Sequence, residues 1–371
     1  MAQQDVALSI HESKPGKVTF EPIVSGGCFG GKVMEPVLPP PFTLQSNPPV
    51  KVKSVVVIYN PFSGPKKNGR KVIQKVVQPM LEEAGIGLKL LETERSEHAI
   101  ELANTTDLTG VDAICALGGD GTLHQVLQGM LTRADGEKRP LCLLPGGTGN
   151  SFCRDYLNVG GTEASFNKEA ATRKAVRALI AGVTRKVDAM QLDAHTLDGV
   201  PKTFFALGIV GWGLGVDASV GAEDLRWMGG IRYDVAIVHE ILKLKKRPCT
   251  LTVDEKTVTT PSMMIVMVHN TVHVGKGLRL APAAQIDDGL IDVLWASTVT
   301  SRKQAIDIFN GVKANGSHVY RDDVEYHRAK EMSISTEEAS NINIDGENNA
   351  QTPAKLKVVP QAYELFVPAD E

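Results

Sequence analysis

A glycine-rich run at residues 118–125, Gly-Gly-Asp-Gly-Thr-Leu-His-Gln, constrains the fold of this chain more than any other feature. The apolar stretch before it, residues 111–117, has the length and composition of a buried strand. Behind the run, apolar residues recur at helical spacing as far as Leu131. The glycines therefore occupy a strand-to-helix turn. There they permit positive φ and let backbone N–H groups approach an anion beside the helix N-terminus.

Asp120 stands in the middle of this run. A carboxylate is unfavourable next to phosphate unless it holds Mg²⁺ or accepts a proton, so the pattern indicates phosphoryl transfer. Two simpler interpretations stay open. The glycines form only a tight turn, or Asp120 is a loop residue that caps the following helix.

Two further turns of the same kind follow predicted strands. Residues 145–150, Pro-Gly-Gly-Thr-Gly-Asn, come after the apolar residues 141–144, and residues 60–64, Asn-Pro-Phe-Ser-Gly, come after 55–59. In a parallel α/β sheet the three loops meet at the carboxyl edge of the strands, where ligands of such folds bind. None of them is a Walker loop, because no Gly-Lys-Ser/Thr follows, and none has the spacing of the dinucleotide fingerprint.

These motifs, in this order, resemble the diacylglycerol kinase/sphingosine kinase superfamily of lipid kinases. The resemblance also rests on residues 93–99, Thr-Glu-Arg-Ser-Glu-His-Ala, and on Asp-Gly-Glu at 345–347, and it runs from about Val52 to the C-terminus. Gly-Trp-Gly at 211–213 and the stretch 226–234, Arg-Trp-Met-Gly-Gly-Ile-Arg-Tyr-Asp, resemble the eukaryotic sphingosine and ceramide kinase branch in particular.

The resemblance implies an ATP-dependent lipid kinase that phosphorylates the primary hydroxyl of a sphingoid lipid, either a sphingoid base or ceramide. It implies ATP and Mg²⁺ as cofactors. The implied fold is α/β + β: an N-terminal Rossmann-like parallel α/β nucleotide domain and a C-terminal antiparallel β-sandwich that binds the lipid. Three alternatives remain: a diacylglycerol kinase, a NAD kinase-like enzyme, which shares Gly-Gly-Asp-Gly-Thr, and a nucleotide-binding regulator without catalysis.

By the same resemblance Asp120 is the catalytic residue, as the base or as a metal-linked carboxylate. The residues expected around the nucleotide are Asn60, Ser63, Gly64, Thr93, Arg95, Gly118, Gly119, Gly121, Thr122, Gly146, Gly147, Thr148, Arg226, Arg232, Gly346 and Glu347. Asp217 and Ser219 are expected to face the lipid headgroup. We assign no metal site beyond the Mg²⁺ carried by ATP, because His98 and His124 have no Cys or His partner at ligand spacing and are interpreted as helix-face or loop residues.

Each of these roles has a plainer alternative. The three arginines are either phosphate ligands, for which the guanidinium fork is suited, or solvated surface charges. Glu347 either reaches back to the nucleotide or the metal, as the resemblance implies, or Asp-Gly at 345–346 is only the turn of a hairpin. The basic residues of 243–247 either meet anionic lipid headgroups or form a solvated helix end.

Three positions depart from the family's pattern. Gln125 stands where most members carry Glu, and Ser151 stands where bacterial diacylglycerol kinases typically have Asp. Ser219 falls on the second acid of the stretch with which sphingosine kinases meet the amino group of the lipid, so that only Asp217 remains. Because a carboxylate stabilises a protonated amine, this departure weakens the case for a free sphingoid base and favours ceramide or diacylglycerol.

Composition limits the partners and the compartment. A net charge of −3 gives no basic field for nucleic acid. The five cysteines are odd in number and widely spaced, as in proteins of a reducing compartment. No apolar run approaches the ~20 residues needed to span a bilayer, and no signal-peptide pattern opens the chain. We therefore expect a cytoplasmic protein with a lipid substrate and transient peripheral membrane contact; its oligomeric state stays unknown.

The sequence divides into three parts. Residues 1–50, with Gly and Pro pairs, predict a loosely ordered N-terminal arm. Residues 51–186 alternate strand and helix patterns, as a nucleotide-binding α/β domain does. Residues 187–371 are rich in short β runs, interrupted by a helical stretch at 226–245, and predict the β-rich lipid-binding domain. The C-terminal strand is a candidate to return to the first domain.

Overall fold

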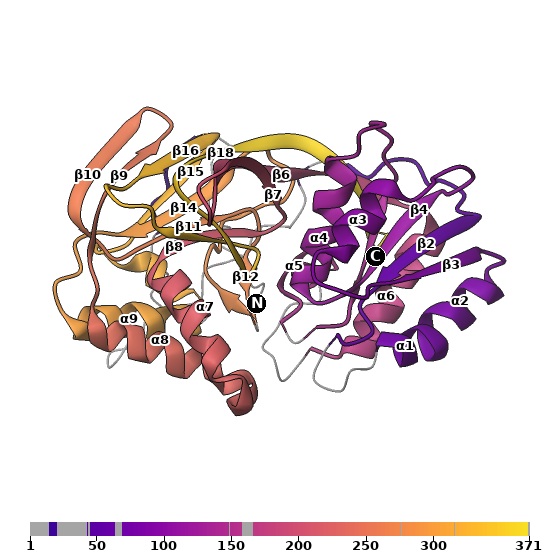
Figure 1. Cartoon of the computed structure of the whole chain (residues 1–371), viewed down its shortest axis with the longest axis horizontal. Helices are drawn as coiled ribbons and strands as arrows, with labels where there is room; N and C mark the ends of the chain where they lie inside the picture. Colours follow the sequence, from indigo (N-terminus) through magenta and orange to yellow (C-terminus); the bar gives the residue numbers. More distant parts are fainter. Residues whose placement is uncertain are drawn as a thin grey trace, which may run out of the picture.

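The computed structural model describes residues 15–20, 43, 45–63, 69–147, 149–157, 166–275, 277–314 and 316–369. The predicted site residues Gly64 and Thr148 lie outside the described residues, as does most of the predicted N-terminal arm, and the side chain of Arg226 is not described. The chain forms two lobes side by side (Figure 1). The long strands β6 (Thr184–Thr196) and β18 (Glu347–Phe366) pair with each other and join the lobes.

The N-terminal lobe is built on a parallel sheet in the order β3-β2-β4-β5. Its strands are β2 (Ser54–Tyr59), β3 (Gly87–Glu92), β4 (Ala113–Gly118) and β5 (Leu141–Pro145). β4 and β5 are buried along their whole length, which explains why they read as continuous apolar runs rather than as alternating ones. The end of β18 lies parallel to β5, where Leu365 pairs with Leu141.

Helices cover this sheet (Figure 1). They are α1 (Gly69–Val72), the π-helical η1 (Ile73–Val77), α2 (Gln78–Glu83), α3 (His98–Thr105), α4 (Asp120–Leu131), α5 (Ser151–Tyr156) and α6 (Lys168–Ala181). α4 follows β4 directly and α5 follows the turn after β5, so each of these two glycine loops leads into a helix. The predicted parallel α/β fold of this lobe is confirmed.

The C-terminal lobe is an antiparallel sandwich. Besides β6 and β18 its strands are β7 (Pro201–Ala206), β8 (Ile209–Gly213), β9 (Arg247–Val253), β10 (Lys256–Met263), β11 (Ile265–His269), β14 (Ile291–Ala296), β15 (Glu325–Ala329), β16 (Glu331–Ser335) and β17 (Asn341–Ile344), with the short pair β12 (His273–Val274) and β13 (Leu278–Arg279). Side chains such as Trp212 and Leu356 fill the core between its layers. The predicted β-sandwich is confirmed.

The helices of this lobe lie at one end of the sandwich (Figure 1). They are α7 (Leu214–Asp224), the 3-10 helix η3 (Arg226–Ile231), α8 (Arg232–Lys243), α9 (Arg302–Lys313) and the 3-10 helix η4 (Ser317–Tyr320). The helical stretch predicted at 226–245 thus begins as a 3-10 turn and becomes an α-helix only at Arg232.

Described parts of the N-terminal arm contact the second lobe at two places. β1 (Gly16–Lys17) adds an antiparallel strand to β15, and Phe20 packs edge-on against Tyr326. Thr43 donates its backbone N–H and its hydroxyl to Asp287 Oδ1, at 2.6 and 2.8 Å. These contacts bind the described residues of the arm to the body of the protein.

Candidate active site

The predicted loops meet at the carboxyl edge of the parallel sheet. The backbone N–H of Asn60 donates to Leu117 O at the end of β4, with an N–O distance of 3.2 Å. Gly146, after β5, donates to Gly118 O at 2.7 Å, and Thr93, after β3, donates to the last residue of β2 at 2.9 Å. Four strand ends are therefore held together by backbone hydrogen bonds in one layer.

The glycines of these loops are required by close approach rather than by backbone conformation. The expectation that they permit positive φ is wrong for Gly118, Gly119, Gly146 and Gly147, whose φ lies outside the left-handed region. A Cβ on Gly118 would lie 2.4 Å from Thr122 Cβ, and one on Gly147 would lie 2.4 Å from Gly119 Cα. The two loops thus pack backbone against backbone, and any side chain would push them apart.

Asp120 is the first residue of α4, and its carboxylate connects the two glycine loops. Its Oδ2 accepts the Ser151 hydroxyl at 3.3 Å, and the first backbone N–H groups of α5 lie close enough to lower the pKa of the carboxyl. It therefore serves the start of α5 rather than capping its own helix, for which no side-chain cap bond exists. Among the described residues, its buried Oδ1 has no hydrogen-bond partner.

The electrostatic setting of Asp120 suits a group that accepts a proton. Burial raises the pKa of Asp120, the hydrogen bonds from the start of α5 lower it, and the nearby Asp345 carboxylate raises it again. The net pKa lies above the usual range of an aspartate. A buried carboxylate with one unpartnered oxygen and a raised pKa is typical of a general base.

Asp345 and Gly346 form a two-residue hairpin turn in which both φ values are positive, 50° and 99°. The buried Asp345 carboxylate accepts backbone N–H groups of Leu207 and Gly208, at 2.6 and 2.9 Å. Its Oδ2 also lies 3.0 Å from His124 Nδ1 of α4. Burial raises the pKa of Asp345, but the bonds from His124 and from the backbone outweigh it, so this pKa lies below the usual range.

The same turn carries Glu347 to the start of α4. A Cβ on Gly121 would lie 2.8 Å from Glu347 Oε1, so the carboxylate rests directly on that glycine. The turn itself is closed by the Gly346 N–H, which donates to Asn343 Oδ1 at 2.9 Å. Residues 345–347 therefore form a hairpin turn and also lie beside the glycine loop, so the two interpretations do not exclude each other.

The predicted headgroup residues lie on α7, beside the hairpin that carries Glu347. Ser219 Oγ is 3.5 Å from the side-chain amide nitrogens of both Asn343 and Asn348. Asp217 forms a half-buried ion pair with Arg247. The negative charge of Asp217 is therefore already compensated by the protein itself.

The predicted phosphate ligands Arg95 and Arg232 make local contacts. Arg95 pairs with Glu101, and both side chains are largely exposed. Arg232 stacks on Tyr233 and donates to its hydroxyl at 2.9 Å. These contacts do not involve the glycine loops. The side chain and carbonyl of Asn60 also act locally, because its Oδ1 accepts the Phe62 N–H and its carbonyl accepts the Ser63 N–H.

His124 is the site residue that sequence reasoning missed. The absence of a Cys or His at metal-ligand spacing predicts a helix-face or loop residue for His124, and its partner is instead the distant carboxylate of Asp345. The available signal was its position one helical turn after Asp120, which puts both side chains on the same face of α4.

The residues at this edge fit a nucleotide with its metal. The start of α4 offers backbone N–H groups and the positive end of a helix dipole to phosphate. Mg²⁺ bound with a nucleotide takes one or two carboxylates and keeps several waters, a role that the carboxylate of Glu347 fits. In the described part of the chain, no group of three or more His, Cys, Asp or Glu could hold a metal ion by itself.

Two protein families match this chain. The diacylglycerol kinase catalytic domain matches residues 54–192, and the YegS C-terminal NAD kinase beta sandwich-like domain matches residues 208–367. Among curated relatives, sphingosine kinase 1 of Arabidopsis thaliana is 34% identical over 197 residues, which is 52% of this chain and 38% of the plant protein. The match thus spans well under half of that relative's length.

Other relatives match over more of their length. Sphingosine kinase 1 of Mus musculus is 28% identical over 308 residues, 72% of this chain and 78% of the mouse protein. A diacylglycerol kinase of Mycobacterium tuberculosis is 27% identical over 323 residues, 86% and 96% of the two chains. A solved diacylglycerol kinase structure from Bacillus anthracis superposes with a TM-score of 0.60 at 20% identity, covering 86% of this chain and 98% of that one. This likeness is one of fold.

Proposed function

Because the chain belongs to the diacylglycerol kinase/sphingosine kinase superfamily of lipid kinases, we propose that it transfers the γ-phosphoryl group of ATP to the primary hydroxyl of a sphingoid lipid. The lipid is a sphingoid base or ceramide. The observation that carries the proposal is the position of Asp120. Its unpartnered oxygen lies buried at the start of a helix, between two glycine loops, and the Glu347 carboxylate rests on the neighbouring Gly121.

In the proposed reaction the lipid hydroxyl oxygen attacks the γ-phosphorus and its proton passes to Asp120 Oδ1, while ADP leaves. Bound Mg²⁺ neutralises phosphate charge. The backbone N–H groups of the 118–122 and 146–148 loops support the phosphates. Asn60, Ser63 and Thr93 line the nucleotide at the neighbouring strand ends. The proposed nucleotide site is completed by Gly64, Thr148, Arg95, Arg226 and Arg232.

A diacylglycerol substrate is the second candidate, and one observation favours it. Asp217, which would meet a protonated amine, is paired with Arg247, and Ser219 offers a hydroxyl instead of a second carboxylate. A cationic headgroup gains little from a carboxylate whose charge is already balanced. Neutral headgroups, those of ceramide and diacylglycerol, fit this surface better than a free sphingoid base.

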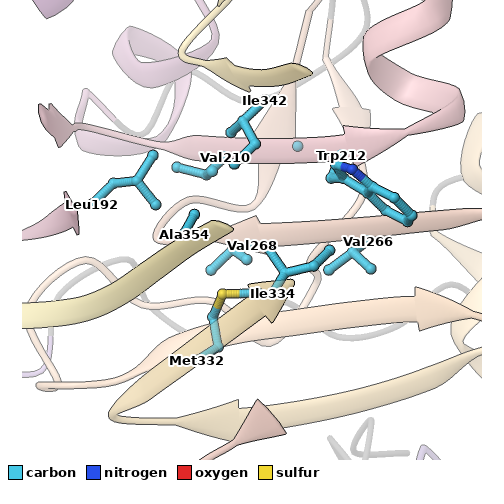
Figure 2. Close-up of a pocket in the computed structure, with 10 residues that line it drawn as sticks. Leu192, Val210, Trp212, Val266, Val268, Met332, Ile334, Ile342 and Ala354 are labelled. Atoms are coloured by element: carbon cyan, nitrogen blue, oxygen red, sulfur yellow. The ribbon is translucent and has the colours of Figure 1, made fainter. Parts of the chain in front are cut away.

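The acyl chain is expected in the sandwich core. Figure 2 shows a cavity there, between side chains of β8, β11, β16 and β17, and its volume is about 10 Å³. It is lined by Leu192, Val210, Gly211, Trp212, Val266, Val268, Met332, Ile334, Ile342 and Ala354. A cavity of this size holds about one water-sized sphere. Binding of an acyl chain therefore requires these core side chains to move apart.

The lipid is proposed to reach the site from a membrane surface. Four exposed apolar side chains recur on one face at the start of and along α8: Ile231, Val235, Val238 and Leu242. Trp227, in the preceding turn, is 81% exposed. In the basic run after this face Lys243 pairs with Glu240 and Arg247 with Asp217, whereas Lys245 and Lys246 are exposed. Within the described residues no helix has the length and apolarity needed to cross a bilayer.

A panel assay tests the proposal. Purified protein is incubated with radiolabelled ATP and, separately, with sphingoid base, ceramide, diacylglycerol and NAD. Label in a lipid phosphate is expected. Label in NAD alone would identify the NAD kinase-like alternative, and ATP binding without any transfer would identify the regulator.

The same assay tests the base. Asp120→Asn is expected to keep the fold and nucleotide binding and to lower kcat by roughly 10²–10⁴. Asp112→Asn is the matched control, because Asp112 lies at the opposite edge of the sheet, where it accepts the backbone N–H groups of Lys53 and Ser54. Parental turnover by Asp120→Asn would show that Asp120 has no chemical role.

A further inference from the structure

One face of α4 carries a polar side chain at every turn. Asp120, His124 and Gln128 are spaced by four residues, so they share a face. His124 Nδ1 lies 3.0 Å from Asp345 Oδ2, and Gln128 Oε1 accepts the backbone N–H of Phe205 at 2.8 Å. Both partners belong to the second lobe. The helix that begins with the proposed base is therefore fastened to the sandwich along its length.

The helix after the other glycine loop repeats the pattern. In α5, Ser151 donates its hydroxyl to Gly275 O at 3.1 Å. One turn later, Asp155 Oδ1 lies 2.5 Å from His273 Nδ1, and its Oδ2 accepts the His273 backbone N–H at 3.1 Å. Gly275 and His273 are again residues of the second lobe. Each glycine-loop helix thus reaches across the lobe boundary through one buried His–Asp pair.

Both pairs are buried: none of the four side chains is more than 6% exposed. A buried carboxylate is costly unless several donors surround it, and removing one partner leaves much of that cost uncompensated. Asp345 receives backbone N–H groups as well as His124, and Asp155 receives both the ring and the backbone of His273. The carboxylates therefore have defined positions that depend on the two histidines.

What these carboxylates position is the site itself. Asp345 begins the turn that sets Glu347 against Gly121. The Gly275 carbonyl, two residues after His273, accepts Ser151, whose hydroxyl also contacts Asp120. The pair of His124 with Asp345 therefore fixes the position of the Glu347 carboxylate. The pair of His273 with Asp155 fixes the loop that contains Gly275, which lies beside Asp120.

We propose, on the basis of the proposed kinase function, that His124 and His273 are positioning residues that hold the two halves of the site at their working distance. His124 sets Glu347 relative to the start of α4, and His273 sets the Gly275 loop relative to Asp120. The side chains of the site are then assembled across the lobe boundary before substrates bind.

Substitutions at His124 test this proposal. His124→Leu keeps an apolar body but removes the donor, whereas His124→Asn keeps a donor nitrogen close to the position of Nδ1. His124→Leu is expected to lower kcat by about 10²-fold, the effect of misplacing a reacting group by about 1 Å, and to leave the KM for lipid within about twofold. His124→Asn is expected to have a kcat at least tenfold higher than that of His124→Leu. The same pair of substitutions at His273 is expected to behave alike.

His318→Leu is the matched control. His318 is also buried, and it donates to Leu280 O at 3.0 Å, but both residues lie within the second lobe. This variant is expected to lose thermal stability and to keep the parental kcat per folded molecule. If His124→Leu does not fold, His124→Asn is compared with His124→Gln, whose donor reaches the Nε2 position instead of Nδ1.

Hydrogen exchange separates this proposal from the proposed function. The amides of Leu207 and Gly208 are held by Asp345, so His124→Leu is expected to speed their exchange while the amides of β4 stay protected. Faster exchange in a protein that phosphorylates no lipid would refute the kinase function and leave the contact standing. Parental kcat in folded His124→Leu, or equal kcat in the Leu and Asn variants, would overturn the positioning role.

Discussion

Gly121→Ala separates the role of Glu347 from the stability of the fold. The new Cβ would lie 2.8 Å from Glu347 Oε1, whereas ordinary contact begins at 3.4 Å, so the carboxylate has to withdraw by about 0.6 Å. The atom that moves is the end of a flexible side chain, and its movement costs little. In a helix, Ala is more favourable than Gly by about 0.5–1 kcal/mol. The free energy of unfolding is therefore expected to stay constant or to rise by up to about 1 kcal/mol.

The kinetic effect of the same change is expected to be large. Misplacing a catalytic group by about 1 Å costs about 10²-fold in rate. A displacement of about 0.6 Å is thus expected to lower kcat/KM for ATP by about tenfold. Steady-state kinetics with a fixed lipid concentration and urea unfolding of the same preparations measure the two quantities side by side.

Gly129→Ala on the same helix is the control. There the new Cβ would lie 2.4 Å from the Ile100 carbonyl oxygen and 2.7 Å from Ala103 Cβ, and the backbone of α3 cannot withdraw as a side-chain end can. Overpacking of this kind costs about 1–3 kcal/mol, and kcat per folded molecule should not change. If Gly121→Ala lost as much stability as Gly129→Ala, or kept the parental kcat/KM, Glu347 would have no part in the site.

Two further outcomes follow from the site. Ser219→Asp is expected to shift preference toward a cationic sphingoid base by about 1 kcal/mol, because it adds a carboxylate that Arg247 does not balance; an unchanged ratio of kcat/KM on sphingosine and diacylglycerol would refute a headgroup role for α7. Since burial raises the pKa of Asp120 and the base acts only when ionised, kcat/KM is expected to fall as the pH drops through that raised pKa. The acid limb should therefore lie above pH 3.8, the ordinary aspartate value, and a limb centred at or below that value would contradict this environment.

The fold could be predicted from local signals. The runs 55–59 and 141–144 are apolar throughout, and 111–117 is apolar apart from Asp112, because their strands are buried in a sheet covered by helices. Glycines mark the ends of the last two of these strands. Short β-rich runs separated by turn residues after residue 187 predicted the sandwich. The hydrophobic periodicity of a strand depends on which of its faces are buried, and it can be recognised from residues that are neighbours in the sequence.

The contacts that assemble the site could not be predicted in this way. His124 and Asp345 are 221 residues apart in the chain, and their contact depends on the register of β17 with β18 as well as on the docking of α4. The ion pair of Asp217 with Arg247 likewise joins the first turn of α7 to the start of β9. No local pattern distinguishes a carboxylate that the fold already neutralises from one that waits for a ligand.

Asp345 and Glu347, separated only by Gly346, show how two acids close in sequence acquire opposite roles. A type I′ turn needs two residues with positive φ, a conformation that Asp and Gly tolerate better than other residues. The turn directs the Asp345 side chain inward, where backbone N–H groups and His124 saturate it and hold its pKa below the usual range. An acid so saturated has no capacity left for a ligand. Glu347, the next residue beyond the turn, rests on Gly121 instead. Of the two carboxylates, that of Glu347 is therefore the one positioned to meet a ligand.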